Sequence, residues 1–230
     1  MLNPRNAWDN PDAYDRQADE LVHHSVISGL LQSKAKFRRF PHLDHDRLEE
    51  WLCKRQGAKG ETFVVTESVF SMDGDSPNLI QLAELHERYG FAWIVDEAHA
   101  LGWYGGRGTG LLEEHGLSEC PDAVLGTLGK ALGSQGAYLI LRNDAWKRYL
   151  INFAGEFIYS TYLAPATVAS ASQSIELIAE YASARLLWRE GSSQFRTRLI
   201  NGGWQVPQGD SPVVPLFLGE VPLAVKMTKH

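Results

Sequence analysis

Three short apolar segments in the first half of the chain have the length and spacing of buried strands. They are residues 62–66 (TFVVT), 92–96 (AWIVD) and 123–127 (AVLGT). Between the first two, residues 78–90 (NLIQLAELHERYG) repeat apolar side chains with helical period, and Asn78 and Gly90 are placed to cap and end that helix. Strand, helix and strand in this order predict a parallel βαβ unit buried on both faces. The predicted fold class is therefore α/β, with a mostly parallel sheet flanked by helices.

The same pattern predicts elements on both sides of this unit. We expect an amphipathic helix at 44–56, strands at 137–141 and 157–161, a long helix at about 165–200 that Gly191 could break, and a strand at 211–219. Only EVPLAVKMTKH follows that last strand, which predicts that the sequence is cut short. Residues 1–17 are polar and without period, so we expect a loose arm there.

Composition narrows the partners that such a fold could have. The chain has 230 residues and is 44% hydrophobic, so it can bury a sizeable core. Its 22 Lys and Arg against 28 Asp and Glu give a net charge of −6, which argues against nucleic acid or anionic lipid and favours a small-molecule partner. Cys53 and Cys120 indicate neither a zinc site nor a disulfide framework. With a polar start and no long apolar run, we expect a soluble cytoplasmic protein.

The polar residues that follow the three central strands are the main candidates for chemistry. Glu67 and Ser71 follow the first strand, Asp96 and His99 the second, and Thr127 and Lys130 the third. Because ligands of open α/β sheets bind beyond the carboxyl ends of parallel strands, we expect these side chains at one edge of the sheet.

A lysine at such an edge has specific chemistry. Lys130 stands among glycines after an apolar strand, where its ammonium loses charge more readily than in water, and a neutral amine can attack a carbonyl. Pyridoxal phosphate is the carbonyl cofactor that needs a lysine for its aldehyde, a carboxylate for its ring nitrogen, donors for its phosphate and a flat group over its ring. These roles could fall to Lys130, to Asp96, to Thr127 or Ser160 with Thr161, and to a histidine.

Each residue taken alone has a plainer interpretation. A lysine or aspartate at a strand end is commonly a turn or capping residue, and a single histidine is more often packed or exposed than catalytic. His23 and His24 are adjacent and therefore rarely reach one metal ion together. The segment VDEAH is typical of certain helicases, but the sequence contains no GxxxxGK[ST] phosphate loop, and no GxGxxG supports a dinucleotide fold. The joint pattern favours the cofactor hypothesis.

The segments that carry these residues resemble the α-oxoamine synthases, a family of pyridoxal-phosphate enzymes of fold type I. The resemblance rests on VVTESVFSMDGDSPNLIQLAELHERYGFAWIVDEAHALGWYGGRGTG, LGTLGKALGSQGAY and FIYSTYLAPA, in that order, and extends from about Ala18 to Gly219. It implies the large domain of fold type I, truncated at both ends. The implied domains are an irregular arm at 1–17, a partial cofactor-binding large domain at 18–190 and the start of a truncated small domain at 191–230.

The resemblance also implies roles for single residues. Lys130 would bind the cofactor aldehyde, Asp96 would pair with the ring nitrogen and His99 with the phenolic oxygen. His23 would stack on the ring, Ser71 would lie beside the ring and the reacting carbonyl, Thr127 would hold phosphate, and Thr161 would reach the phosphate of a neighbouring subunit. The catalytic residues implied are Lys130, His23 and Ser71, and no metal is implied.

Within the family, FSMDGD, GSQGAY and IYST are most similar to the branch that joins L-alanine to a pimeloyl thioester of CoA or carrier protein, with loss of carbon dioxide, in biotin synthesis. Another branch, such as the 2-amino-3-ketobutyrate ligases, and an inactive remnant that keeps partial cofactor binding are the alternatives. A homodimer is implied because the family's sites lie between subunits. The family has Asp where this chain has Glu97, and its carboxyl-terminal domain with a carboxylate-binding arginine has no counterpart after Gly219. The cofactor site is thus expected to be largely encoded, and the substrate site not.

Overall fold

A six-stranded sheet forms the centre of the computed structural model, which describes residues 14–33 and 36–229. Its spatial order is β2-β1-β3-β4-β5-β6, and the paired neighbours are parallel except for β5 with β6, which are antiparallel. The strands are β1 (Tyr14–Asp19), β2 (Lys36–Phe40), β3 (Glu61–Glu67), β4 (Ala92–Asp96), β5 (Ala123–Thr127) and β6 (Ala137–Leu141). The predicted α/β class with a mostly parallel sheet is confirmed.

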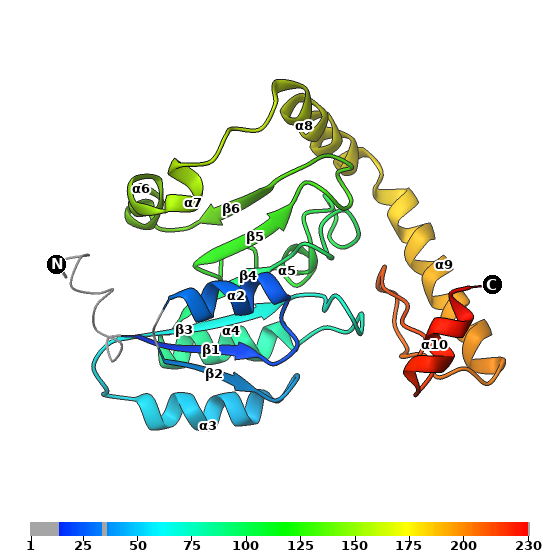
Figure 1. Ribbon diagram of the computed structural model, residues 1–230, viewed down its shortest axis with the longest axis horizontal. Helices are drawn as coiled ribbons and strands as arrows, with labels where there is room; N and C mark the ends of the chain where they lie inside the picture. Colours follow the sequence, from blue (N-terminus) through cyan, green and yellow to red (C-terminus); the bar gives the residue numbers. More distant parts are fainter. Residues whose placement is uncertain (1–13, 34–35, 230) are drawn as a thin grey trace.

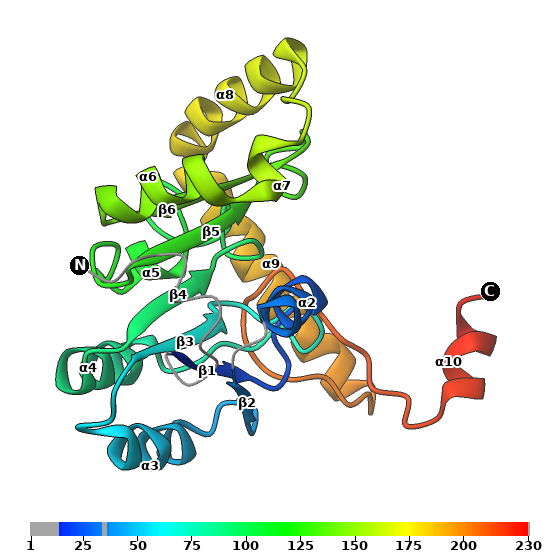
Figure 2. The same ribbon diagram turned by 60° about the vertical axis from the view of Figure 1, so that its left-hand side comes forward.

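Helices connect and cover these strands (Figure 1). They are α2 (His24–Gln32), α3 (His45–Arg55), α4 (Leu79–Tyr89), α5 (Leu111–Glu114), α6 (Asp144–Phe153), α7 (Gly155–Ile158), α8 (Pro165–Glu180), α9 (Ala182–Asn201) and α10 (Val221–Met227). Figure 2 shows α3 and α4 on one side of the sheet and α2 on the other, with α10 projecting away from the sheet. None of the helices in the described ranges is both long and apolar enough to cross a membrane.

Both faces of β3 are buried, as expected of a central parallel strand. Val64 belongs to a cluster with Trp93 of β4 and with Leu48 and Leu82 of the helices α3 and α4. Val65, the next residue, packs on the opposite face in a cluster that also holds Leu30 of α2. Successive strand residues point to opposite faces, so this one strand anchors helices on both sides and its carboxyl end is fixed in position.

The helix predicted at 44–56 is α3, and Asp44 caps it by accepting a hydrogen bond from the Arg47 amide at 2.9 Å. The helix predicted at 78–90 is α4, with Asn78 as its cap and Gly90 in the left-handed conformation at its end. Both predictions are confirmed.

The prediction of a loose arm at 1–17 is wrong for its last residues, because 14–17 belong to β1. This strand pairs with both β2 and β3. Asp15 and Gln17 are buried in it, so it has no alternation of apolar and polar residues from which a strand could be predicted. Residues 1–13 lie outside the described ranges.

Three other expectations are wrong. Residues 157–161 do not form a strand: α7 covers the first two, and the exposed Tyr159 and Thr161 follow it. Residues 211–219 form no strand either, since the carbonyls of Ser211 and Val213 accept hydrogen bonds from Arg196 of α9. The long helix breaks at Tyr181, and α9 continues through Gly191.

Candidate functional site

Three neighbouring parallel strands end in polar residues at one edge of the sheet. Glu67 is the last residue of β3 and pairs in register with Asp96, the last residue of β4. Thr127 ends β5, the next strand, and Lys130 lies three residues beyond it. The charges of Asp96 and Glu67 act on the pKa of Lys130, and the Lys130 charge acts on the pKa of both carboxyl groups. The structure therefore brings together the strand-end groups that the sequence placed at this edge.

Lys130 belongs to a tight turn built around Thr127. The Thr127 hydroxyl oxygen accepts a hydrogen bond from the Gly129 amide at 3.2 Å, and the hydroxyl donates to the Gly136 carbonyl at 3.2 Å. The amide of Gly133, whose φ of +59° suits glycine, donates to the Lys130 carbonyl at 3.0 Å. Thr127 thus shapes the turn that carries the lysine.

The pKa of the Lys130 amine lies below its ordinary value. Partial burial lowers this pKa, and the carboxyl groups of Asp96 and Glu67 oppose the shift without cancelling it. A lysine in this setting gives up its proton more easily than a surface lysine, which is the property required for attack on a carbonyl.

Asp96 and His99 follow one another at the end of β4. Asp96 is buried and accepts a hydrogen bond from the Ala98 amide at 2.8 Å. Burial raises its pKa, while the Ala98 hydrogen bond and the charges of Lys130 and His23 act in the opposite direction. Burial, followed by the charges of Lys130 and His23, lowers the pKa of His99 to about 4. His99 is therefore neutral at pH 7 and donates from one ring nitrogen only.

Glu67 is a residue of this site that the sequence analysis placed at the edge but gave no role. Its side chain is 2% exposed. One carboxyl oxygen accepts a hydrogen bond from the backbone amide of His23, and the other from the amide of Ser71 at 3.2 Å. Burial and then the Asp96 charge raise its pKa to about 7. The signal that could have assigned it a role is its position: it ends β3 as Asp96 ends β4.

His23 and Ser71 reach this edge from two different loops. His23 caps α2: its Nδ1 accepts from the Ser25 amide at 3.3 Å and lies 2.7 Å from the Ser25 hydroxyl. Its ring is exposed, whereas Ser71 is half-buried. The shared bonds to Glu67 hold both backbones at the carboxyl end of β3. Ser160 and Thr161, the other candidates for holding phosphate, lie between α7 and α8 and make no contact with this cluster in the described residues. Thr161 is exposed, and the Ser160 hydroxyl donates to the Glu156 carbonyl.

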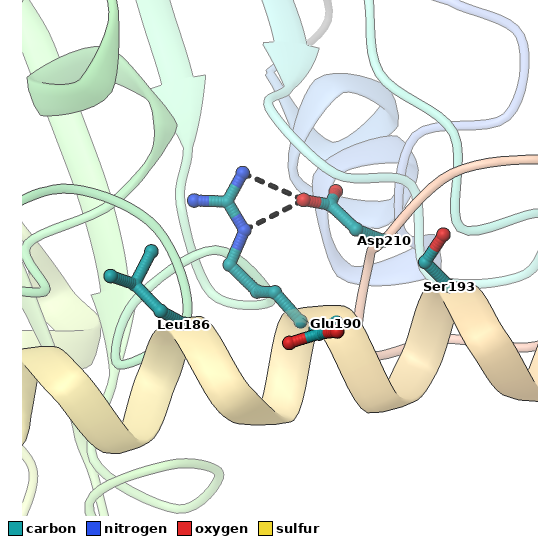
Figure 3. A pocket seen from close by; sticks show the side chains of 5 residues that line it. Leu186, Glu190, Ser193 and Asp210 are labelled. Atoms are coloured by element: carbon teal, nitrogen blue, oxygen red, sulfur yellow. Dashed lines mark hydrogen bonds and ion pairs between the residues drawn. The ribbon is translucent and has the colours of Figure 1, made fainter.

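A separate hollow of about 380 Å³ lies along α9 and contains none of these residues. Figure 3 shows Leu186, Glu190, Ser193 and Asp210 around this hollow. Arg189 also lines it and forms an ion pair with Asp210 at 2.7 Å. Arg189 also binds both carboxyl oxygens of Glu114, at 2.7 and 2.9 Å, and its guanidinium lies 4.6 Å from the Tyr104 ring centre. Its charge is thus already balanced, and the contacts join α9 to the loop after β4.

Residues 17–229 match the family "Aminotransferase class I and II", and the chain belongs to that family. Among curated relatives, it is similar to the 8-amino-7-oxononanoate synthases of Chlorobaculum parvum (41% identical, covering 91% of this chain and 53% of the relative) and Geotalea daltonii (38%, 92% and 54%). The chain spans about half the length of the curated relatives that it matches.

Solved structures give the same result. The 8-amino-7-oxononanoate synthase of Francisella tularensis superposes with a TM-score of 0.80 at 28% identity, over 94% of this chain and 62% of that one. The serine palmitoyltransferase of Sphingomonas wittichii gives 0.87 at 26%, over 93% and 54%. The predicted fold type and the resemblance to α-oxoamine synthases are confirmed.

Proposed function

We propose that this chain binds pyridoxal phosphate through Lys130 and carries the cofactor half of an 8-amino-7-oxononanoate synthase. That enzyme would join L-alanine to a pimeloyl thioester with loss of carbon dioxide. The observation that carries the proposal is the Lys130 amine, whose pKa is lowered, placed just beyond the end of β5 and next to the buried Asp96 carboxyl at the end of β4.

The donor set at this edge fits the cofactor. An amine that loses its proton readily suits an aldehyde, and a buried carboxyl suits a protonated ring nitrogen. A neutral His99 can donate one hydrogen bond to a phenolic oxygen. His23 has an exposed ring that is free to lie against a flat ligand, and Ser71 is fixed beside it.

When bound, pyridoxal phosphate would supply an aldehyde carbon for the amine and a ring that withdraws electrons from the carbon next to that nitrogen. Lys130 would hold its Nζ in the neutral form and, once free, take the proton from the substrate's α-carbon. Asp96 would keep a proton at the ring nitrogen. Glu67 would fix the backbones of His23 and Ser71 at the carboxyl end of β3, where the cofactor would be held.

The proposed substrates are assigned from the curated relatives of this chain. Chains named 8-amino-7-oxononanoate synthase share 38–41% of residues with this one over about 214 positions. The branch assignment rests on these curated relatives, because the solved 8-amino-7-oxononanoate synthase (28% identical) and the serine palmitoyltransferases (26–27%) are about equally similar to this chain. The free thiols of Cys53 and Cys120 fit the reducing cytoplasm that we propose as its compartment.

We further propose a homodimer whose interface includes residues 157–163. Phe157, Tyr159, Tyr162 and Leu163 are 53, 89, 83 and 42% exposed in a single chain. Exposed aromatic residues grouped in one segment favour a protein partner. A second copy placed there would bring Thr161 toward a neighbouring cofactor site.

The proposed activity is tested by release of free CoA thiol from pimeloyl-CoA by the full chain with pyridoxal phosphate and an amino acid. We expect L-alanine to react about tenfold or more faster than glycine, which lacks the methyl group, and Lys130→Ala to abolish the reaction. A preference for glycine or serine would contradict the assigned branch. Cofactor binding without thiol release would contradict catalysis by this chain and leave the cofactor site standing.

A further inference from the structure

His42, in the loop between β2 and α3, has both ring nitrogens against carboxylates. Nδ1 lies 2.8 Å from Asp19 Oδ1, and Nε2 lies 3.0 Å from Asp75 Oδ2. Asp19 ends β1, His42 follows β2 and Asp75 follows β3, so the three residues are distant in sequence. We call them the His42 bridge. Asp19 is 1% exposed, and the His42 side chain is 18% exposed.

The geometry requires a positively charged ring. A carboxylate only accepts hydrogen bonds, so a contact at each nitrogen needs a proton on each, which only the imidazolium has. The surroundings are acidic as well: Glu20 accepts from the His42 amide at 3.1 Å, and Asp73 is clustered with His42 and Asp75. Four carboxyl groups from two loops thus face one histidine.

The His42 bridge connects the two loops that carry His23 and Ser71. Asp19 ends β1 and also accepts hydrogen bonds from the amides of Leu21 and Leu43, both at 2.9 Å, so it orders the path toward His23. Leu43 needs that support because its φ of 57° is unfavourable for a non-glycine residue.

Asp75 closes the loop on the other side. Its carbonyl accepts from the Phe70 amide at 2.9 Å, and the Phe70 carbonyl accepts from the Gly74 amide at 3.0 Å. Ser71 lies inside this closed loop. The buried Phe70 ring contacts the His42 ring edge to face, with ring centres 4.5 Å apart.

We propose that His42 is a positioning residue: as an imidazolium it bridges Asp19 and Asp75 and thereby fixes the loop that carries His23 against the loop that carries Ser71. Glu67 makes the inner connection between the same loops, and the His42 bridge makes the outer one. The inference rests on the proposed function only in that His23 and Ser71 are taken to face the cofactor.

A metal site is the other chemistry that His42, Asp73 and Asp75 could serve, since their ligand atoms lie within 4.8 Å of one another. A metal ion needs a lone pair on the imidazole, however, and both ring nitrogens lie at hydrogen-bond distance from carboxylates, which accept from a protonated nitrogen. The contacts therefore favour the charged bridge.

The bridge should weaken at high pH. Burial lowers the pKa of His42, but the hydrogen bonds to Asp19 and Asp75 and the charges of these carboxylates outweigh burial and hold the pKa above its ordinary value. A raised histidine pKa contributes stability that is complete below the unfolded-state pKa and is lost as the pH rises through the folded-state value. Deprotonation removes one donor and releases one of the two loops.

The first test follows the ring nitrogens of His42 by two-dimensional ¹H–¹⁵N NMR of the full chain during a pH titration. We expect the imidazolium signature at pH 6.5 and a titration midpoint that falls in Asp75→Asn, which keeps the shape of the side chain and removes its charge. A neutral His42 ring at pH 6.5, or a midpoint unmoved by Asp75→Asn, would overturn the proposal.

The second test measures hydrogen exchange at the amides of His23 and Ser71. In His42→Asn we expect both to exchange on the order of tenfold faster, because a charge-assisted connection between the loops is lost. Both amides also donate to Glu67, which titrates near pH 7, so the comparison is between the two proteins: protection should fall more steeply with rising pH in the wild type than in His42→Asn, which keeps only the intrinsic base catalysis and the Glu67 titration.

The matched control is His86→Asn. His86 of α4 also pairs with an aspartate at 3.2 Å, but that residue, Asp122, stands just before β5, at the opposite edge of the sheet. We expect no change at His23 or Ser71 in this variant. Equal exchange in all three proteins would overturn the positioning role. Neither test requires cofactor, so a failure of the bridge is distinguishable from a failure of cofactor binding.

Discussion

Glu67 shows how the protonation of a single carboxyl depends on its position in the fold. It is buried at a strand end, next to Asp96 in register, and accepts two backbone hydrogen bonds. Its pKa of about 7 means that the folded chain holds a proton there that the unfolded chain releases near pH 4.5. By linkage, this group makes the fold less stable as the pH rises from 4.5 to 7.

Replacing this carboxyl with an amide should flatten that dependence. Between pH 5 and 8 we expect the unfolding free energy of the wild type to fall by on the order of 2–3 kcal/mol more than that of Glu67→Gln. Urea denaturation at both pH values measures this unfolding free energy. Glu84→Gln, at an exposed position of α4, serves as the control and should keep the wild-type slope. Parallel slopes in all three proteins would contradict the pKa of Glu67.

The sequence was sufficient to place Glu67, Asp96 and Lys130 at one edge, because each follows a strand whose apolar run identifies it. The position of His23 at the same edge of the sheet could not be predicted from residue patterns. The strand that precedes His23, β1, buries Asp15 and Gln17 and has no apolar pattern, and only a resemblance to known sequences pointed to His23.

At the scale of elements, the loop after β4 depends on the side chain of Glu97. The buried Glu97 carboxyl accepts hydrogen bonds from the Ser68 hydroxyl at 2.8 Å and from the amides of Leu111 and Leu112 at 3.0 and 2.7 Å. It thereby connects the end of β3 to the start of α5. Gly110 leaves the space that the longer side chain occupies: a Cβ there would lie 2.3 Å from a Glu97 oxygen.

Gly110→Ala should therefore destabilise the fold by at least about 2 kcal/mol, because it adds a clash to an unfavourable φ of +134°. Gly209→Ala separates the two effects, since Gly209 has nearly the same φ of +135° but nothing within 4 Å of its Cβ position. Thermal unfolding of both variants measures the difference. If the two lose equal stability, Glu97 does not fill the space beside Gly110.

Elements bounded by clear signals could be predicted, and those that depend on distant contacts could not. Asn78 and Gly90 mark α4 in the sequence itself. The apolar pattern at 211–219, by contrast, predicts a strand. In the structure the Arg196 guanidinium donates hydrogen bonds to the carbonyls of Ser211 and Val213, so these carbonyls do not pair with a neighbouring strand. Propensity yields to such tertiary contacts.

At the scale of the whole molecule, the proposed dimer makes a prediction of its own. Tyr162→Glu should raise the dimer dissociation constant at least about tenfold, because it puts a charge on the exposed aromatic segment 157–163. Analytical ultracentrifugation at several protein concentrations measures this dissociation constant. Ile80→Glu, at a 52% exposed isoleucine on α4, is the matched control and should leave association unchanged. A monomeric wild type, or equal effects of both changes, would contradict this interface.

The central claim is that the strand-end edge binds pyridoxal phosphate through Lys130. Its most direct test is borohydride reduction of the full chain mixed with the cofactor, followed by peptide mass spectrometry. We predict loss of a visible absorbance band and a stable cofactor label on the peptide that contains Lys130, with neither the band nor the label in Lys130→Ala. A label on other lysines alone, or a visible band that persists in Lys130→Ala, would contradict the claim.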